Sequence, residues 1–281
     1  STDAAIKLRI ECAIRSVGRI ELPHGPLPYA GTGFVVGPSR IMTNRHVAVI
    51  FANGLGDKDI VFKTGLSAGF DLKRERDDGE GIVLEVVRVL LIHPYWDCAV
   101  LEVNGLPADA KPLVLAADAA ADLVEREIAV IGYPAYDPRN PAEVQHDLLN
   151  GIFRVKRLQP GVLGTLAGAA SFGKLVQAIG HDASTLGGNS GSCLLDLGTG
   201  KVAGLHFSGV YRERNNAVPA VELGSDARLH DAGVTFEAPR PSRDPPWIAW
   251  WDRATPGKAI RADRDSADRA PASAGGSMVT V

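Results

Sequence analysis

The stretch STLGGNSGSCLL, residues 184–195, is the most informative part of the sequence for the fold. It begins as a glycine-rich turn around Ser190 and continues into an apolar run that is typical of a buried strand. Glycine reaches backbone angles that are closed to other residues, so such a turn can point several amide N–H groups at one spot. Taken alone, a glycine-rich turn is most often only a turn, and the rest of the chain supplies its context.

Short strand-like runs fill most of the chain around that turn. Near the N-terminus they are SVGRIEL (16–22), GTGFVV (31–36) and RIMTNRHVAV (40–49). Further runs are expected at 82–92, 98–103, 113–115, 128–133, 152–157, 162–167, 174–179, 192–197, 201–207 and 232–236. About a dozen short strands, bounded by Gly, Pro or Asn, indicate an all-β chain built as barrels or as a sandwich.

Two segments outside the strands have helical patterns. Residues 2–14 place apolar side chains near one helical face, at Ile6, Ile10, Ala13 and Ile14. The segment AADAAADLVERE (116–127) is the best interior helix candidate, of which only a turn or two need form.

The composition changes beyond Phe236. The segment PRPSRDPPWIAWW (239–251) holds three tryptophans among prolines, and the residues after it are rich in Asp, Arg, Ala, Ser and Gly. We expect the tryptophans to pack on their own domain, with docking of a partner as the alternative. The residues after them are expected to form a disordered tail. The closing MVTV is apolar and strand-like, which suggests that the tail leads to a further domain.

These features divide the chain into three parts. Residues 1–14 form an N-terminal helix, residues 15–236 form the β domain, and residues 237–281 form a Pro- and Trp-containing extension.

Composition also narrows the partners and the compartment. A formal net charge of −3 gives no electrostatic reason to expect nucleic acid or an anionic membrane as partner. No apolar run approaches the roughly 18 residues that span a bilayer. Three scattered cysteines fit neither a disulfide framework nor a metal site, and Cys98 and Cys193 are expected to be small buried hydrophobes. A reducing, cytoplasmic location is expected, and a signal peptide removed earlier stays open because the chain begins with Ser1.

Three segments together supply the parts of a nucleophilic site. His46 lies in TNRHV, where we expect it to end a buried strand, and Asp97 opens the apolar run of HPYWDCAVLEV. Taken separately, each of the three segments has an ordinary explanation: His46 as a structural histidine, Asp97 as a turn residue, and the Ser190 segment as a tight turn. A serine hydroxyl, however, needs an adjacent base, and the base needs a buried carboxylate. The amides of Gly188 and Ser190 would supply the N–H donors that stabilise an oxyanion.

The motifs GTGFVV, TNRHV, WDCAVLEV and GGNSGS resemble the trypsin-like, chymotrypsin-fold serine peptidases. The similarity is strongest to the disulfide-free bacterial branch that includes the glutamyl endopeptidases, and it covers residues 15–236. It implies an all-β fold of two six-stranded antiparallel β-barrels with the active site between them. It also implies a serine endopeptidase that works through an acyl-enzyme with the triad His46, Asp97 and Ser190, without a metal or cofactor.

The resemblance also suggests a substrate pocket. Ser184 would lie at its base, and an uncharged base argues against recognition of Lys or Arg. Thr185 and His206 resemble the Thr and His that bind a substrate carboxylate in glutamyl endopeptidases, which implies a preference for Glu or Asp. The alternative is that His206 merely packs beneath the site. The backbone expected to pair with the substrate is that of Phe207, Ser208 and Gly209.

The expected partners are protein or peptide substrates. Relatives in the bacterial branch can occur beside effector domains, so limited cleavage of an effector that follows the C-terminal tail is a further expectation. The alternative from another class is a catalytically silent protease-like module that binds a peptide or partner. His146 and His181 lack the spacing of metal ligands, and a solvated or turn position is the simpler interpretation for both.

Overall fold

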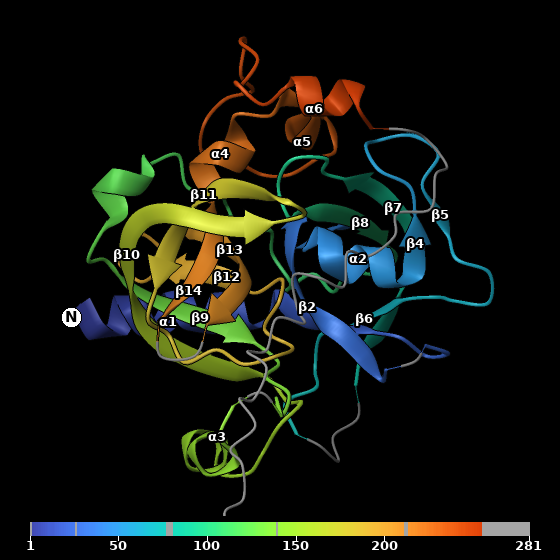
Figure 1. Cartoon of the computed structure of the whole chain (residues 1–281). Helices are drawn as coiled ribbons and strands as arrows, with labels where there is room; N and C mark the ends of the chain where they lie inside the picture. The colour runs from blue at the N-terminus through green and yellow to red at the C-terminus, as the bar shows by residue number, and fades with distance from the viewer. Residues whose placement is uncertain (1, 26, 77–80, 139, 211–212, 255–281) are drawn as a thin grey trace, which may run out of the picture.

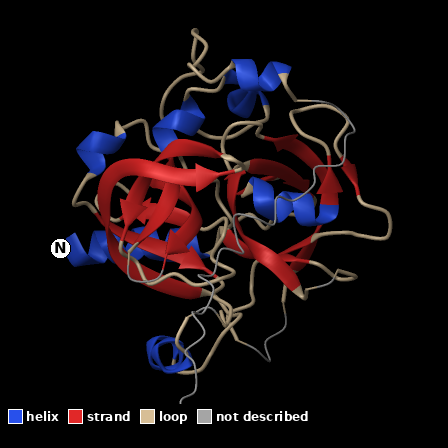
Figure 2. Cartoon of the chain, viewed as in Figure 1, coloured by secondary structure: helices blue, strands red, loops and turns tan. Residues whose placement is uncertain are grey.

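The computed structural model describes residues 2–25, 27–76, 81–138, 140–210 and 213–254. Its strands form two closed antiparallel barrels of six strands each, which lie side by side (Figures 1 and 2). The expected two-barrel architecture is therefore confirmed. The disordered tail was expected to begin at residue 252, but Asp252 ends the helix α6 (Ala249–Asp252). Residues 255–281, with the expected link to a further domain, lie outside the described residues.

The first barrel closes in the order β1-β2-β3-β8-β7-β6. Its strands are β1 (Val17–Glu21), β2 (Tyr29–Gly37), β3 (Arg40–Thr43), β6 (Gly69–Asp71), β7 (Val83–Ile92) and β8 (Ala99–Val103). A separate two-stranded sheet pairs β4 (Ala52–Asn53) with β5 (Val61–Phe62). Strand β2 is buried almost throughout, because its far side faces the second barrel.

The second barrel closes in the order β10-β11-β14-β13-β12-β9. Its strands are β9 (Glu127–Gly132), β10 (Arg157–Ser171), β11 (Lys174–His181), β12 (Cys193–Asp196), β13 (Val202–Val210) and β14 (Arg214–Pro219). Strand β13 has a register shift between His206 and Ser208, so Phe207 occupies a β-bulge.

Short helices lie outside the two barrels. They are α1 (Thr2–Ile14), α2 (Arg45–Phe51), the 3-10 turn η1 (Ala120–Leu123), α3 (Ala142–Leu149), α4 (Ala220–Gly224), α5 (Ala227–Asp231) and α6 (Ala249–Asp252). The predicted N-terminal helix is confirmed as α1, which packs Ile10, Ala13 and Ile14 against the core.

Several sequence-based assignments were wrong in detail. The runs 113–115 and 232–236 are not strands, because Leu115 makes only isolated bridges, to Val202 and Phe236. The runs 152–157 and 162–167 were expected to be separate, yet a single strand, β10, begins at Arg157 and continues through the second run. The helix candidate at 116–127, of which only a turn or two need form, gives the single turn η1, and beyond it the Glu125 amide donates to the Leu163 carbonyl of β10.

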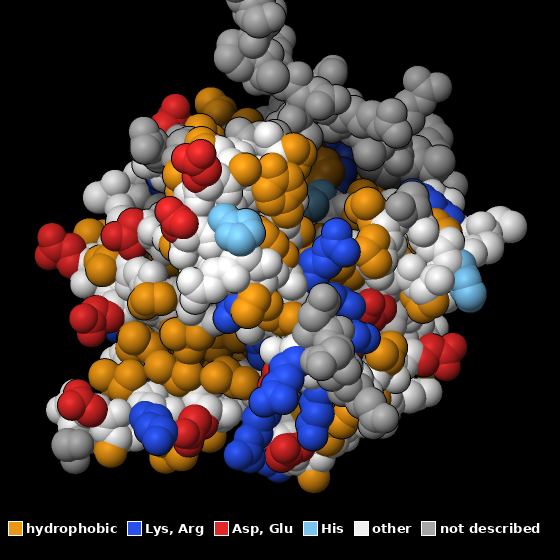
Figure 3. Space-filling view, turned by 90° about the horizontal axis from the view of Figure 1, so that it is seen from below, with side chains coloured by type: hydrophobic (Ala, Val, Ile, Leu, Met, Phe, Trp, Pro, Cys, Tyr) orange, Lys and Arg blue, Asp and Glu red, His pale blue; other side chains and the backbone are white. Residues whose placement is uncertain are grey.

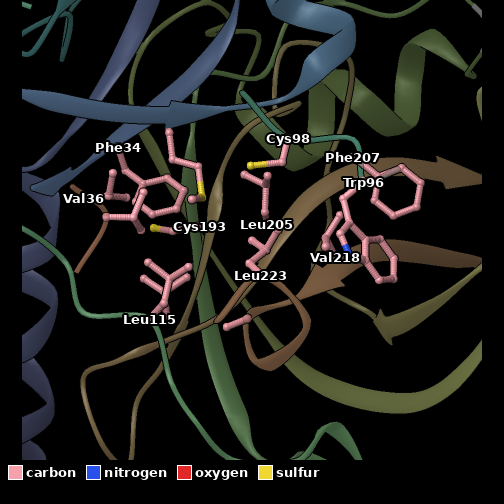
Figure 4. Packing of buried hydrophobic residues seen from close by; sticks show 14 of the residues in the cluster. Phe34, Val36, Trp96, Cys98, Leu115, Cys193, Leu205, Phe207, Val218 and Leu223 are labelled. Atoms are coloured by element: carbon pink, nitrogen blue, oxygen red, sulfur yellow. The ribbon is translucent and has the colours of Figure 1, made fainter. Parts of the chain in front are cut away.

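A hydrophobic cluster between the barrels joins them into one unit. Phe34 and Cys98 of the first barrel pack with Cys193 and Leu205 of the second, all fully buried (Figure 4). Both cysteines are free thiols, as expected of small buried hydrophobes. This shared core fixes the position of one barrel against the other, so residues contributed by both can form a single site.

One face of the molecule carries both a hydrophobic region and a strip of basic side chains. Seen from below, hydrophobic side chains gather on one side and Lys and Arg side chains form a strip along the middle (Figure 3). Exposed large apolar residues include Val144 and Leu148 of α3, and Leu158, Val162 and Leu166 of β10. None of the helices in the described ranges is both long and apolar enough to cross a lipid bilayer.

Candidate active site

The carboxylate of Asp97 holds His46 at two points. Its Oδ2 lies 2.7 Å from the ring Nδ1 of His46, and its Oδ1 accepts the backbone N–H of the same residue at 3.0 Å. His46 is not at a strand end, as expected, but in the first turn of α2, which begins directly after β3. The first amides of a helix lack partners within it, so Asp97 satisfies one of them while orienting the ring.

Neighbouring residues fix Asp97 in turn. The side-chain amide of Asn44 donates to the Asp97 carbonyl at 2.9 Å, and Asp97 is only 5% exposed.

Burial of the His46 ring opposes its protonation. The charge of Asp97 and its hydrogen bond outweigh that effect and raise the pKa of His46 above its usual value. The pair therefore favours an imidazole that accepts a proton at Nε2 while Nδ1 stays bonded.

The turn around Ser190 is anchored to both barrels. The amide of Thr32 in β2 donates to the Ser190 carbonyl at 2.8 Å, and the amide of Gly191 donates to the His206 carbonyl at 3.0 Å. A Cβ added at Gly31 would lie 2.8 Å from the Ser190 carbonyl oxygen and 2.9 Å from Val47 of α2. Strand β2 is thus in close contact with both the Ser190 turn and the helix that carries His46.

The structure brings His46 and Asp97 into contact, and it bonds the Ser190 turn to β2, the strand whose Gly31 also lies against the helix that carries His46. In the described part of the chain, no hydrogen bond joins the Ser190 hydroxyl to the His46 ring. Such bonds are commonly long in free enzymes and tighten when substrate binds.

The backbone before Ser190 forms a turn that presents free amides. The Asn189 amide donates to the Leu186 carbonyl at 3.2 Å, and Gly188 has a φ of 87°, as a type II turn requires at its third residue. The Gly187 carbonyl accepts the Ala135 amide at 2.6 Å, which directs the N–H of the same peptide unit to the opposite side. The amides of Gly188 and Ser190 donate to no other described residue, as donors for an oxyanion must.

The residues expected to form the pocket lie around β13. Thr185 donates its hydroxyl to Asn215 Oδ1 at 2.8 Å, and the Ser184 carbonyl accepts from Gln159 at 2.9 Å. The hydroxyl of Ser208 accepts from Asn216 of β14 at 3.2 Å. Phe207 in the bulge is 6% exposed, and Gly209 follows at the more open end of the strand.

A second histidine lies behind His206. His181 of β11 is buried, and its Nε2 lies 3.1 Å from His206 Nδ1, so the solvated or turn position expected for it was wrong. Sequence reasoning missed this pair because His181 and His206 are far apart in the chain. Strand β14 lies between β11 and β13 and brings the two histidines together. Burial lowers the pKa of His181 to about 4 and holds that of His206 well below its usual value, so both rings are neutral.

Metal chemistry has no evident ligand set here. Across the described ranges, no group of three or more His, Cys, Asp or Glu residues is placed to bind a metal ion.

The turn at Ser190 requires a glycine at position 191, and this requirement can be tested. Gly191 has a φ of 88°, and an added Cβ would lie 2.0 Å from the Thr32 carbonyl oxygen. We expect Gly191→Ala to lower the free energy of unfolding by about 3 kcal/mol or more, since backbone strain and a clash combine. Gly65→Ala is the matched control, because Gly65 also has a positive φ but open space around it, so about 1 kcal/mol is expected. Equal losses in urea unfolding would contradict the role assigned to the Thr32 contact.

The buried histidine pair predicts acid sensitivity. Unfolded histidines protonate near pH 6.5, whereas His181 in the folded state has a pKa of about 4. Between those values the unfolded chain binds more protons. The free energy of unfolding should therefore fall on acidification, by up to about 1.4 kcal/mol per pH unit for each such histidine. Urea unfolding between pH 6.5 and pH 4.5 measures the slope. His181→Gln should flatten it, and His24→Gln, at an exposed histidine, should not.

Comparisons with known proteins agree with this architecture. Residues 31–205 match the family model described as the trypsin-like peptidase domain. A "Probable serine protease" of Lysobacter enzymogenes is 32% identical over an alignment of 244 residues that covers 76% of this chain. The chain spans 62% of the length of that relative.

Solved structures show the same fold. The active form of the Rv3671c protease from M. tuberculosis has a TM-score of 0.53 at 22% identity, covering 83% of this chain and 87% of the other. Deg5 has a TM-score of 0.53 at 24% identity, covering 79% of this chain and 91% of the other. The family match runs from β2 into β13 and covers strands of both barrels. The chain therefore belongs to the trypsin-like peptidase domain family.

Proposed function

We infer that this protein is a serine endopeptidase that hydrolyses peptide bonds through an acyl-enzyme. The observation that carries the proposal is the pair of hydrogen bonds that Asp97 makes with His46, to ring Nδ1 at 2.7 Å and to the backbone amide at 3.0 Å. With Nδ1 held in this way, His46 Nε2 has no hydrogen-bond partner among the described residues, as a general base requires. The Ser190 turn, bonded to β2 next to the same helix, supplies the nucleophile.

The proposed reaction uses groups of this chain alone. Ser190 Oγ attacks the substrate carbonyl while His46 Nε2 takes the hydroxyl proton, and Asp97 stabilises the imidazolium that forms. The amides of Gly188 and Ser190 bind the oxyanion of the tetrahedral intermediate. His46 then delivers its proton to the leaving amine, and water attacks the acyl-enzyme by the same steps in reverse order.

Strand β13 offers an edge for the substrate backbone. It pairs with β14 as far as Val210, but its pairing with β12 ends at Leu205. Residues 207–209 therefore have backbone groups with no strand partner on that side within the described ranges. An extended peptide can add there as a further strand, which would place its scissile bond near Ser190.

We propose that the pocket prefers Glu or Asp before the scissile bond. A neutral His206 donates to a substrate carboxylate only if its proton is on Nε2, so that Nδ1 accepts from His181 Nε2. The opposite assignment would put the His181 proton on Nδ1, which is buried and has no partner among the described residues. An unpaired buried donor costs more than an unpaired acceptor, so the arrangement favours the donating form. Thr185 contributes less than expected, because its hydroxyl already donates to Asn215.

The silent-module alternative is disfavoured by the same geometry. A peptide-binding module needs the β13 edge, but it has no need of a buried carboxylate aligned on His46. Limited cleavage of an effector stays a proposal about the biological role. Intact-mass comparison of the full-length protein with its Ser190→Ala variant tests it, since identical termini would argue against self-processing.

Loss of the nucleophile tests the proposed function. We expect Ser190→Ala to abolish labelling by a fluorophosphonate probe and to lower peptide hydrolysis by about 10⁴-fold or more. Ser192→Ala is the matched control, because that hydroxyl lies two residues away, buried and without a partner among the described residues. Labelling of Ser190→Ala at the wild-type level would contradict the assignment of Ser190 as the nucleophile.

The pocket assignment is tested with peptides that differ only before the scissile bond. We expect kcat/KM to be higher for Glu or Asp than for Gln, and lowest for Lys. His206→Leu should remove the advantage of Glu over Gln while leaving fluorophosphonate labelling in place. Cleavage after Lys or Arg, with none after Glu or Asp, would refute the acidic preference.

A further inference from the structure

We propose that His93 is a positioning residue that holds the turn carrying Asp97, and that the C-terminal tryptophans lock it in place. The inference rests on the proposed function, since it concerns the alignment of the Asp97–His46 pair. His93 is the first residue after β7, and Asp97 lies in the same short connection to β8. Both residues are buried.

The His93 ring organises that connection from within. Its Nδ1 accepts the backbone amides of Tyr95 and Trp96, each at 3.0 Å. The His93 amide donates to the Cys98 carbonyl at 2.9 Å, which closes the connection around the ring. Two donors on Nδ1 require an unprotonated nitrogen there, so the ring proton is on Nε2. One imidazole nitrogen therefore fixes the backbone immediately before Asp97.

The other nitrogen of the ring faces a second carboxylate. His93 Nε2 lies 3.1 Å from Asp226 Oδ2, and both side chains are fully buried. Asp226 is the N-cap of α5, where it accepts the Arg228 amide at 2.9 Å, and it also accepts the Trp251 indole N–H at 2.8 Å. The Nε2 contact is electrostatic, because it lacks the angles of a hydrogen bond. A carboxylate this close still favours a proton on Nε2, so Asp226 agrees with the acceptor state of Nδ1.

Aromatic rings of the C-terminal segment enclose this pair. The His93 ring centroid lies 4.9 Å from that of Trp247 and 5.1 Å from that of Trp251. Tyr95 stacks on Trp247 at 5.5 Å with an interplanar angle of 5°. Both tryptophans are 7% exposed. Figure 1 shows α5 and α6 together at the top of the view, on the side of β7 and β8.

These contacts form a continuous path from the C-terminal segment to the catalytic base. It runs from Trp251 through Asp226 and His93 to the turn amides, and from there through Asp97 to His46. His93 lies behind Asp97 and acts only through it. Because catalysis is sensitive to shifts of about an ångström, a loosened turn should slow the reaction without weakening substrate binding.

The two nitrogens of His93 can be tested separately. Asn places an amide oxygen near the position of Nδ1 and can still accept the two turn amides, whereas Gln reaches toward Nε2 and leaves them unpaired. We therefore compare His93→Asn with His93→Gln by their rates of fluorophosphonate labelling at Ser190, across pH. Melting temperature is measured alongside, so that the comparison is made on folded protein.

We expect His93→Gln to label at least tenfold more slowly. His93→Asn keeps an acceptor for the two turn amides but loses the contact with Asp226, so we expect it to slow labelling by a smaller factor of about two to five. The pH midpoint of labelling should also move to lower pH in His93→Gln, because a displaced Asp97 no longer raises the pKa of His46 as strongly. A loss of folded protein alone would reduce the amount of labelling without moving this midpoint.

A second variant keeps the test valid if His93→Gln does not fold. Trp251→Phe retains an aromatic ring but removes the N–H that Asp226 accepts, and we expect slower labelling with the same direction of midpoint shift. Wild-type rates and midpoints in the folded variants would overturn the inference. So would equal losses in His93→Asn and His93→Gln, which would indicate packing alone. Absence of labelling in wild type would instead refute the proposed function.

Discussion

The two hydrogen bonds between Asp97 and His46 are the interaction on which the rest of the site depends. One carboxylate binds both the ring and the backbone of the same histidine, so the position of the ring depends on where β8 begins relative to α2. Two side chains on separate segments can meet this closely only if both segments are rigid. The closed first barrel supplies that rigidity, because β3, which leads into α2, pairs directly with β8.

The junction between the barrels adds the third group. Ser190 belongs to the second barrel, yet its carbonyl accepts an amide from β2 of the first, and Thr32 also donates its hydroxyl to the Gly188 carbonyl at 2.8 Å. Fully buried residues such as Phe34 and Leu205 fill the space between the barrels. The geometry of the Ser190 turn is therefore a property of the interface between the barrels.

Sequence pattern alone was a sound guide where a local rule applies. Glycines with positive φ at 188 and 191 follow from the turn that Ser190 needs, and the alternating runs located most strands. It failed where a distant partner decides the outcome. His46 was expected at a strand end, but it lies in the first turn of a helix, where Asp97, far along the chain, accepts its amide. The runs 113–115 and 232–236 were expected to be strands, but Leu115 makes only isolated bridges, to Val202 and Phe236.

The sequence by itself determined the order of the chemical groups, the glycine-rich turn and the expectation of two six-stranded barrels through family resemblance. These depend on residue type and short spacing, which are local properties of the chain. Only the tertiary structure decided that His181 lies behind His206, and that His93, Asp226 and Trp251 brace the Asp97 turn. Those contacts join residues far apart in the chain. Their pairing is set by barrel closure and the packing of the C-terminal segment, which no short-range pattern encodes.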